Sequence, residues 1–301
     1  MTATAAPATA TPTGTNDPFG PRRVPGAVLV LIAMAVLHTG SALATELFPA
    51  LGPAGTTWLR LSFAGIFLLA FTGRSLWRTL RAARRADLVA TALLGVVSAA
   101  MMLLFSEASA RLPLGTATAL EFLGPLSVAV VASRRSRELA WLAVAATGVL
   151  LLTAPWTGAT SSTGILFGLG SAACWALYVV GTAHVGSRFS APHALAVSLS
   201  VAALAAAPFG APAAVAALTW QTAAAAAGIA VLMPLVPFLL EMKALQRIGK
   251  TTYGTLAGLE PAVSLLAGMV LIAQTPDVLQ LAGTALVVTA GIGATRAESR
   301  R

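Results

Sequence analysis

Charged residues are scarce in this sequence. Asp, Glu, Lys and Arg make up only 10% of its 301 residues, whereas soluble domains carry about 25%. Hydrophobic residues make up 57%, and the mean hydropathy is +0.84. Such a composition is typical of a membrane protein, and no stretch is polar enough to form a separate soluble domain.

The residues of most enzymes' active sites are also missing as patterns. A single cysteine, Cys174, excludes an intrachain disulfide. There is no Gly-rich phosphate loop with Lys, no His and Cys spacing for zinc, no Asp inside the predicted spans away from their ends, and no nucleophile beside a base. We therefore expect no metal, no cofactor and no enzyme. A passive channel remains open, and it would conduct without saturation.

Long apolar runs predict an all-α polytopic membrane protein. A hydrocarbon core about 30 Å thick needs roughly 20 apolar residues per helix. The sequence offers ten such runs. The predicted transmembrane spans are 24–46, 54–72, 87–108, 113–133, 139–154, 164–184, 192–210, 222–241, 251–273 and 277–295.

The basic residues indicate the orientation. They lie in the N-terminal tail and after every even-numbered span, whereas the opposite loops hold only Arg111. By the positive-inside rule both termini are cytoplasmic, which explains the net charge of +9 without nucleic acid as a partner. The basic residues are Arg22, Arg23, Arg74, Arg78, Arg81, Arg84, Arg85, Arg134, Arg135, Arg137, Arg188, Lys243, Arg247, Lys250, Arg296, Arg300 and Arg301.

A weak internal repeat predicts two halves. ASARLPLGTATALEFLGP from Ala108 and ALQRIGKTTYGTLAGLEP from Ala244 align without gaps and pair Pro125 with Pro261, whereas a competing register pairs Glu121 with Glu260. Five spans per half is odd, so the second half enters the membrane inverted, as in many secondary transporters. The expected units are a disordered cytoplasmic tail at 1–23, five-helix repeats at 24–154 and 164–295, and a cytoplasmic tail at 296–301.

Three segments resemble a known family. They are LPLGTATALEFLGPLSVAVVASRR from Leu112, SAACWALYVVG from Ser171 and PFLLEMKALQRIGKTTYGTLAGLEP from Pro237. Together they resemble the threonine and homoserine exporters of the drug/metabolite transporter superfamily, which are built from two EamA-type repeats. The last extracellular turn of that family often carries Gly-Glu, and here Ala273 and Gln274 stand in its place.

The resemblance implies a multi-pass carrier of the bacterial plasma (inner) membrane that exports small amino acids such as threonine and homoserine by alternating access, with proton coupling. Its partners would be the amino acid and the lipid bilayer. The exact substrate, direction and energy coupling are open. A carrier for another metabolite or drug is the alternative, and a homodimer is also open.

Glu121 is the only charged residue between Pro113 and Ser133. A charge at the centre of a membrane helix costs about 2.5 to 3.5 kcal/mol, so Glu121 should face a cavity or a partner. It could bind the substrate ammonium or carry the coupling proton, and the alternative is a protonated acid bonded to a neighbouring helix. Pro125, one turn on, is expected to break the helix beside it.

Glu260 is the second candidate acid. It precedes Pro261, another expected helix break, and Tyr253 lies seven residues earlier. It could serve substrate binding or proton coupling, or it could satisfy the broken helix. We expect Glu241, near the end of its span, to pair with Lys243 at the membrane interface.

Two spans carry polar stripes at helical spacing. His38, Ser41 and Thr45 lie on the first span, and Ser171, Trp175, Tyr178 and Thr182 lie on the sixth. Both stripes could face one central cavity or serve helix packing, and His38 could also relay protons. Arg60, inside the second span, could pair with a glutamate, meet a substrate carboxylate or snorkel to the interface.

Overall fold

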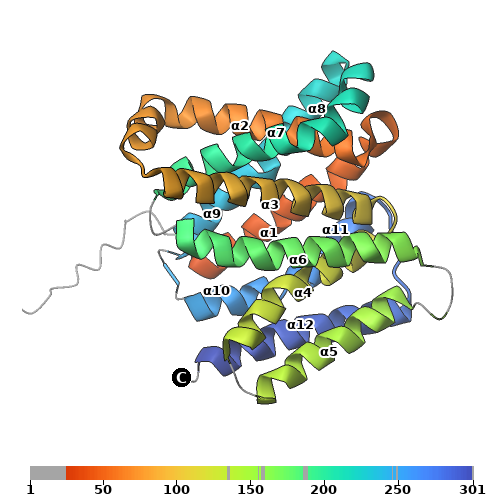
Figure 1. Ribbon diagram of the computed structural model, residues 1–301. Helices are drawn as coiled ribbons and strands as arrows, with labels where there is room; N and C mark the ends of the chain where they lie inside the picture. The colour runs from red at the N-terminus through yellow and green to blue at the C-terminus, as the bar shows by residue number, and fades with distance from the viewer. Residues whose placement is uncertain are drawn as a thin grey trace, which may run out of the picture.

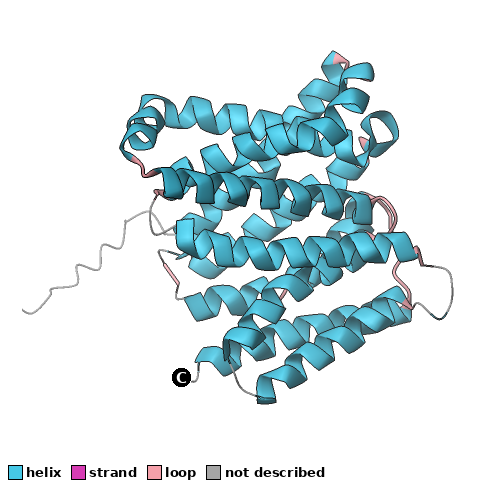
Figure 2. Cartoon of the chain, viewed as in Figure 1, coloured by secondary structure: helices cyan, strands magenta, loops and turns pink. Residues whose placement is uncertain are grey.

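The computed structural model describes residues 25–133, 136–154, 156, 160–185, 189–245, 247–248 and 250–299, so the tail expected at 1–23 lies outside the described residues. Figure 2 shows helices joined by short loops, with no strand in the described part of the chain. The helices are α1 (Gly26–Thr45), α2 (Phe48–Ala82), α3 (Arg85–Ser109), α4 (Leu114–Ser133), α5 (Ser136–Thr153), α6 (Ser162–Val185), α7 (Ala191–Ala216), α8 (Trp220–Ala230), the π-helical turn η2 (Val231–Leu235), α9 (Val236–Leu245), α10 (Lys250–Ala257), α11 (Glu260–Leu271) and α12 (Val278–Ser299).

The helices have the length and apolar character that a bilayer requires. Within the described chain, seven segments are long and apolar enough to cross a membrane, and two shorter apolar helices cover 139–153 and 255–271. Helix is found in all ten predicted ranges. Helix α12 continues to Ser299, into the range 296–301 that was expected to be a cytoplasmic tail. The seven segments are Gly26–Thr45, Phe48–Ala82, Arg85–Ser109, Ser162–Thr182, Pro192–Ala216, Trp220–Glu241 and Val278–Arg296.

Glycine residues delimit the straight part of α2. Gly52 and Gly73 have positive φ angles of 69° and 46° and non-helical ψ angles, so the helix changes direction at both positions. Glycine adopts positive φ readily because it lacks Cβ. The straight segment between them matches the predicted span 54–72, and the last turns of α2 carry its basic residues in a new direction.

Two predicted spans are interrupted. The range 222–241 is divided by η2, in which Met233 has non-helical angles (φ −151°, ψ 100°) and precedes Pro234. The range 251–273 is divided where α10 ends and α11 begins, with Pro261 in the first turn of α11. Proline suits a first turn because it has no N–H to donate.

The break expected at Pro125 is absent. Helix α4 is continuous from Leu114 to Ser133 with this proline inside it. Membrane helices tolerate an internal proline where their neighbours hold the helix in place. A close neighbour is present, since a Cβ added at Gly124 would collide with the Ala172 carbonyl oxygen of α6.

Small residues let the helices approach closely. Figure 1 shows α2 and α7 along one edge, α5 and α12 along the opposite edge, and α3 and α6 between them. A Cβ added at Gly148 of α5 would lie 2.7 Å from the carbonyl oxygen of Gly283 on α12. Gly55 of α2 faces Gly210 of α7, whereas Gly65 faces Ser200, so these two helices run antiparallel.

The outer surface is apolar and the interior holds polar groups. Large hydrophobic side chains such as Phe71, Val270 and Val278 are more than 70% exposed. Soluble monomers rarely expose contiguous apolar patches beyond a few hundred Å², so such a surface indicates contact with lipid. The chain is therefore a multi-pass membrane protein whose interior holds buried polar residues.

Candidate functional site

Polar side chains from eight segments meet inside the helix bundle in two neighbouring groups. We define the Arg60 group as Ser41 (α1), Arg60 (α2), Glu121 (α4), Ser171 (α6) and Met233 (η2). We define the Glu260 group as His38 (α1), Glu241 (α9), Tyr253 (α10) and Glu260 (α11). Glu121 and Glu260 lie within electrostatic range of each other, so the two groups form one polar centre.

Glu121 lies on the inner face of α4. Its Oε1 is 2.6 Å from Ser171 Oγ, which is also 3.0 Å from the Met101 carbonyl oxygen of α3. Arg60 lies within electrostatic range of the Glu121 carboxyl group. Glu121 is about seven residues into α4, or roughly 10 Å along its axis. The partner expected for this carboxyl group is therefore present.

Arg60 is buried and incompletely bonded. It is only 2% exposed, so it does not snorkel to the membrane interface. Its Nη1 lies 3.1 Å from Met233 Sδ, while Nε and Nη2 have no hydrogen-bond partner among the described residues. A thioether is a weak acceptor, and a buried guanidinium without strong acceptors is costly. The site therefore presents free N–H donors to an anion.

Helix α1 completes the Arg60 group. Ser41 Oγ lies 3.4 Å from Met233 Sδ, so the sulfur lies between a hydroxyl and a guanidinium. Gly40 allows this approach, because a Cβ there would be 3.1 Å from the Met233 Cβ. The sequence-based candidates omitted Met233. Pro234 inside a predicted span was the available signal, since proline interrupts a helix.

The Glu260 group is built around the break between α10 and α11. Glu260 is the first residue of α11, and its Oε1 lies 3.7 Å from His38 Nε2. His38 is 2% exposed, and neither of its ring nitrogens has a hydrogen-bond partner among the described residues. The position at a helix N-terminus is favourable for a carboxylate. Two ionisable side chains thus face each other inside the bundle.

Glu241 corrects one expectation. It does not pair with Lys243, which is exposed; instead it accepts a hydrogen bond from the Tyr253 hydroxyl and lies within electrostatic range of Glu260 and Tyr178. Proximity to Lys243 in sequence was misleading, because residues two apart lie on different faces of a helix. Glu241 therefore joins the site as a third acid.

The aromatic candidates on α6, Trp175 and Tyr178, are not among the residues that form the hydrogen bonds of the polar centre described above. Trp175 packs against an apolar cluster that includes Phe122. Tyr178 packs against Leu94 and Phe189. Both are contacts with apolar clusters, and Tyr178 also lies within electrostatic range of Glu241. Of the predicted α6 stripe, Ser171 is the residue that touches an acid of the site.

The helices that carry the two predicted acids are tied together. Thr118 Oγ1 of α4 lies 2.7 Å from Ser264 Oγ of α11. Gln274 Oε1 accepts a hydrogen bond of 3.0 Å from the Leu114 N–H, the first of α4. Gln274 therefore caps α4 at a position where the family resemblance leads one to expect Glu.

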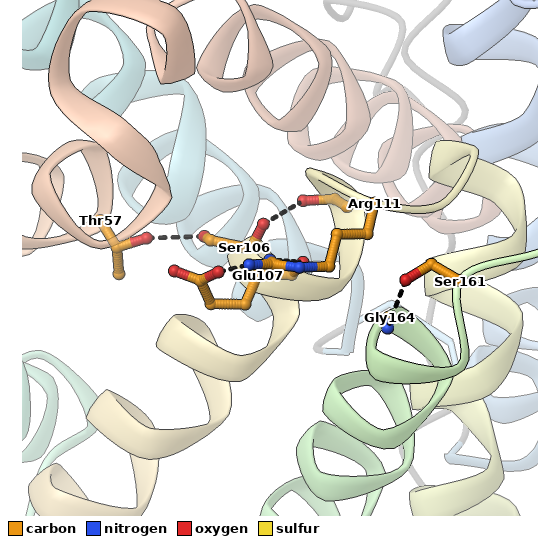
Figure 3. Close-up of polar contacts among 7 residues, drawn as sticks. Thr57, Ser106, Glu107, Arg111, Ser161 and Gly164 are labelled. Carbon is orange, nitrogen blue, oxygen red and sulfur yellow. Dashed lines mark hydrogen bonds and ion pairs between the residues drawn. The ribbon is translucent and has the colours of Figure 1, made fainter.

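A third polar group, which is not part of the polar centre, lies at the C-terminal end of α3. Figure 3 shows Arg111 folded back onto Glu107, with which it forms an ion pair, and Thr57 bonded to Ser106 at 2.6 Å. The Glu107–Arg111 pair is partly exposed. Exposed ion pairs contribute little to stability, so we assign this pair no part in the candidate site.

Among the described residues no three His, Cys, Asp or Glu side chains lie close enough to hold a metal ion. The polar centre combines acids with a guanidinium and hydroxyls, which is suited to a ligand that carries both charges.

The chain is similar to known transporter proteins. The model of the EamA-like transporter family matches residues 162–295. The chain is similar to the threonine/homoserine exporter RhtA of Escherichia coli (strain K12), with 36% identity over 271 residues, or 89% of this chain and 90% of the relative. The exporter of the same name from Salmonella typhimurium (strain LT2) is 35% identical over the same shares. One solved structure, described only as the crystal structure of a protein, is 16% identical and gives a TM-score of 0.59 over 92% of this chain and 99% of that chain, which shows the fold alone.

Proposed function

The chain belongs to the family of threonine/homoserine exporters among the EamA-like transporters, and on this premise we propose that it is a secondary transporter that exports small amino acids such as threonine and homoserine. The main support is the buried Arg60 guanidinium, which lies within electrostatic range of Glu121 and whose Nε and Nη2 have no hydrogen-bond partner among the described residues. To bind a zwitterionic amino acid, a site needs a positively charged group for the ligand's carboxylate and a carboxylate for the ligand's ammonium group, a short distance apart.

Arg60 and Ser41 would bind the substrate carboxylate. A guanidinium can donate two parallel N–H bonds to a carboxylate, and such charge-assisted bonds are about twice as strong as neutral ones. Ser41 lies on the same side of the site, since it shares Met233 Sδ with Arg60. Two donors from different helices would thus orient the substrate.

Glu121 would bind the substrate ammonium, and the Glu260 group would handle the coupling proton. Ser171 holds the Glu121 carboxyl group in place at 2.6 Å. His38 and Glu260 face each other at 3.7 Å, a separation at which a proton on either group alters their mutual attraction. The electrostatic coupling between Glu121 and Glu260 would let proton and substrate influence each other.

We propose alternating access through two inverted five-helix repeats. Exchange of the two halves pairs α2 with α7 and α5 with α12, and both pairs are in contact. Under the same exchange, α3 corresponds to the segment that contains η2 and α9, and α6 corresponds to α1. The contact of α3 with α6 therefore predicts a contact of α1 with η2 and α9, which is also present. Helices α4 and α10 begin at Leu114 and Lys250. The repeat alignment that pairs Pro125 with Pro261 also pairs these two residues. These symmetric contacts support the repeat.

The protein would lie in the bacterial inner membrane with both termini in the cytoplasm. Three of the basic residues on which this orientation depends, Arg74, Arg78 and Arg81, lie on α2 from Gly73 onward. The positive-inside rule then assigns that end of the bundle to the cytoplasm. Transport without covalent chemistry would require no catalytic residue.

The test is counterflow of labelled threonine in proteoliposomes, with homoserine as competitor, with and without an imposed pH gradient. We expect saturable exchange that homoserine inhibits and that an inward proton gradient accelerates in the export direction. Absence of exchange by protein that is monodisperse in detergent and inserted in the vesicles would refute this substrate class.

A further inference from the structure

Met233 is the acceptor that Arg60 contacts most closely among the described side chains. Its Sδ lies 3.1 Å from Arg60 Nη1 and 3.4 Å from Ser41 Oγ. Both donors would bond far more strongly to a carboxylate than to a thioether. The sulfur therefore occupies the position at which these two donors converge, and it is a weak occupant of that position.

The backbone allows the Met233 side chain to leave. Met233 lies in η2 with non-helical angles, between α8 and α9, so no regular helix constrains its direction. The Met233 Cβ lies close to Gly40 of α1, and Leu232, its neighbour in η2, also lies close to Gly40. Methionine is unbranched and has three rotatable side-chain bonds. Rotation about these bonds would move the sulfur while the Cβ stays against α1.

We propose that Met233 is a displaceable occupant of the substrate-carboxylate subsite. In the structure its thioether contacts Arg60 and Ser41. When substrate binds, the carboxylate takes the Arg60 and Ser41 donors, including the unpartnered Nε or Nη2, and the Met233 side chain withdraws. Met233 thereby sets the affinity for carboxylate ligands. This inference rests on the proposed function.

Two variants separate displacement from simple packing. Met233→Leu keeps the side-chain volume and removes the sulfur acceptor, and Met233→Ala removes the occupant altogether. We expect both to lower the half-saturation concentration of threonine in counterflow by roughly twofold to tenfold, the range of one hydrogen bond lost to the competitor. Inhibition by threoninol, which lacks the carboxylate, should not change. Met269→Ala, a change at an exposed residue of α11, is the matched control.

A direct observation uses methyl-labelled methionine and nuclear magnetic resonance in lipid nanodiscs. The chain has seven methionines, and the signal missing from Met233→Leu identifies Met233. We expect its methyl resonance to shift on addition of threonine or propionate and to stay in place with threoninol.

Threonine exchange and the Met233 resonance together distinguish a failure of displacement from a failure of the exporter function. If the wild-type protein exchanges threonine while the Met233 resonance is unmoved at saturating threonine, displacement is refuted and the exporter stands. If threonine is not exchanged but propionate shifts the resonance, the exporter is refuted and the subsite stands for another carboxylate. If neither ligand shifts the resonance, displacement is refuted.

Discussion

Replacement of Glu121 by Gln tests the polar centre most directly. Gln retains the oxygen to which Ser171 donates at 2.6 Å and has nearly the same volume, so α4 should keep its packing. What is lost is the negative charge that faces Arg60. A hydrogen bond to a charged group contributes about 1.5 to 3 kcal/mol, so loss of the ammonium contact should raise the half-saturation concentration roughly 10- to 150-fold.

The assay is threonine counterflow in proteoliposomes together with gradient-driven efflux. If Glu121 binds the ammonium, the variant loses both activities at ordinary substrate concentration. If it carries the coupling proton instead, counterflow persists and acceleration by the pH gradient disappears. Insertion, measured by the fraction of protein that floats with the vesicles, should be unchanged in both cases.

Glu107→Gln is the matched control, because Glu107 forms a partly exposed ion pair with Arg111 at the end of α3. Its transport should equal that of the wild type. If Glu121→Gln also exports threonine at the wild-type rate with unchanged pH dependence, Glu121 neither binds the ammonium nor carries the coupling proton.

Three further changes follow from the packing and the bonds of the site. Arg60→Lys should raise the half-saturation concentration for threonine at least tenfold, because an ammonium cannot donate two parallel bonds; unchanged counterflow kinetics would contradict a carboxylate contact. Gln274→Ala should destabilise the protein by about 1 kcal/mol through loss of a helix cap, seen as a lower melting temperature in detergent, whereas Gln274→Glu should retain most of the stability. Gly124→Val should lower the melting temperature strongly because its Cβ meets the Ala172 carbonyl oxygen, and Gly228→Ala, where an added Cβ meets nothing within 4 Å, should have little effect.

Hydropathy was sufficient to locate the helices. Each of the ten predicted ranges contains helix, because apolar runs of bilayer length have few other stable arrangements. Proline was less informative. Pro261 lies at a break and Pro125 inside a continuous helix, since the outcome depends on how neighbouring helices hold the chain.

The site was partly predictable. Glu121 and Glu260 were candidates because a charge inside a span requires a partner, and the structure supplies Ser171 and His38. Glu241 was assigned to the interface, and its contact with Tyr253 depends on α9 packing near α10.

The sequence by itself determined the membrane class, the helical ranges and the family, because these depend on composition, run length and motifs along the chain. Only the tertiary structure showed that Arg60 is buried and does not snorkel to the interface, whereas the sequence allowed an ion pair, a substrate contact or snorkelling. Met233 is 173 residues away in the chain and meets Arg60 only when η2 packs against α1 and α2. Depth in the membrane follows from residue number at 1.5 Å per residue, but the direction in which a side chain points depends on helix rotation, and rotation is set by contacts between distant segments.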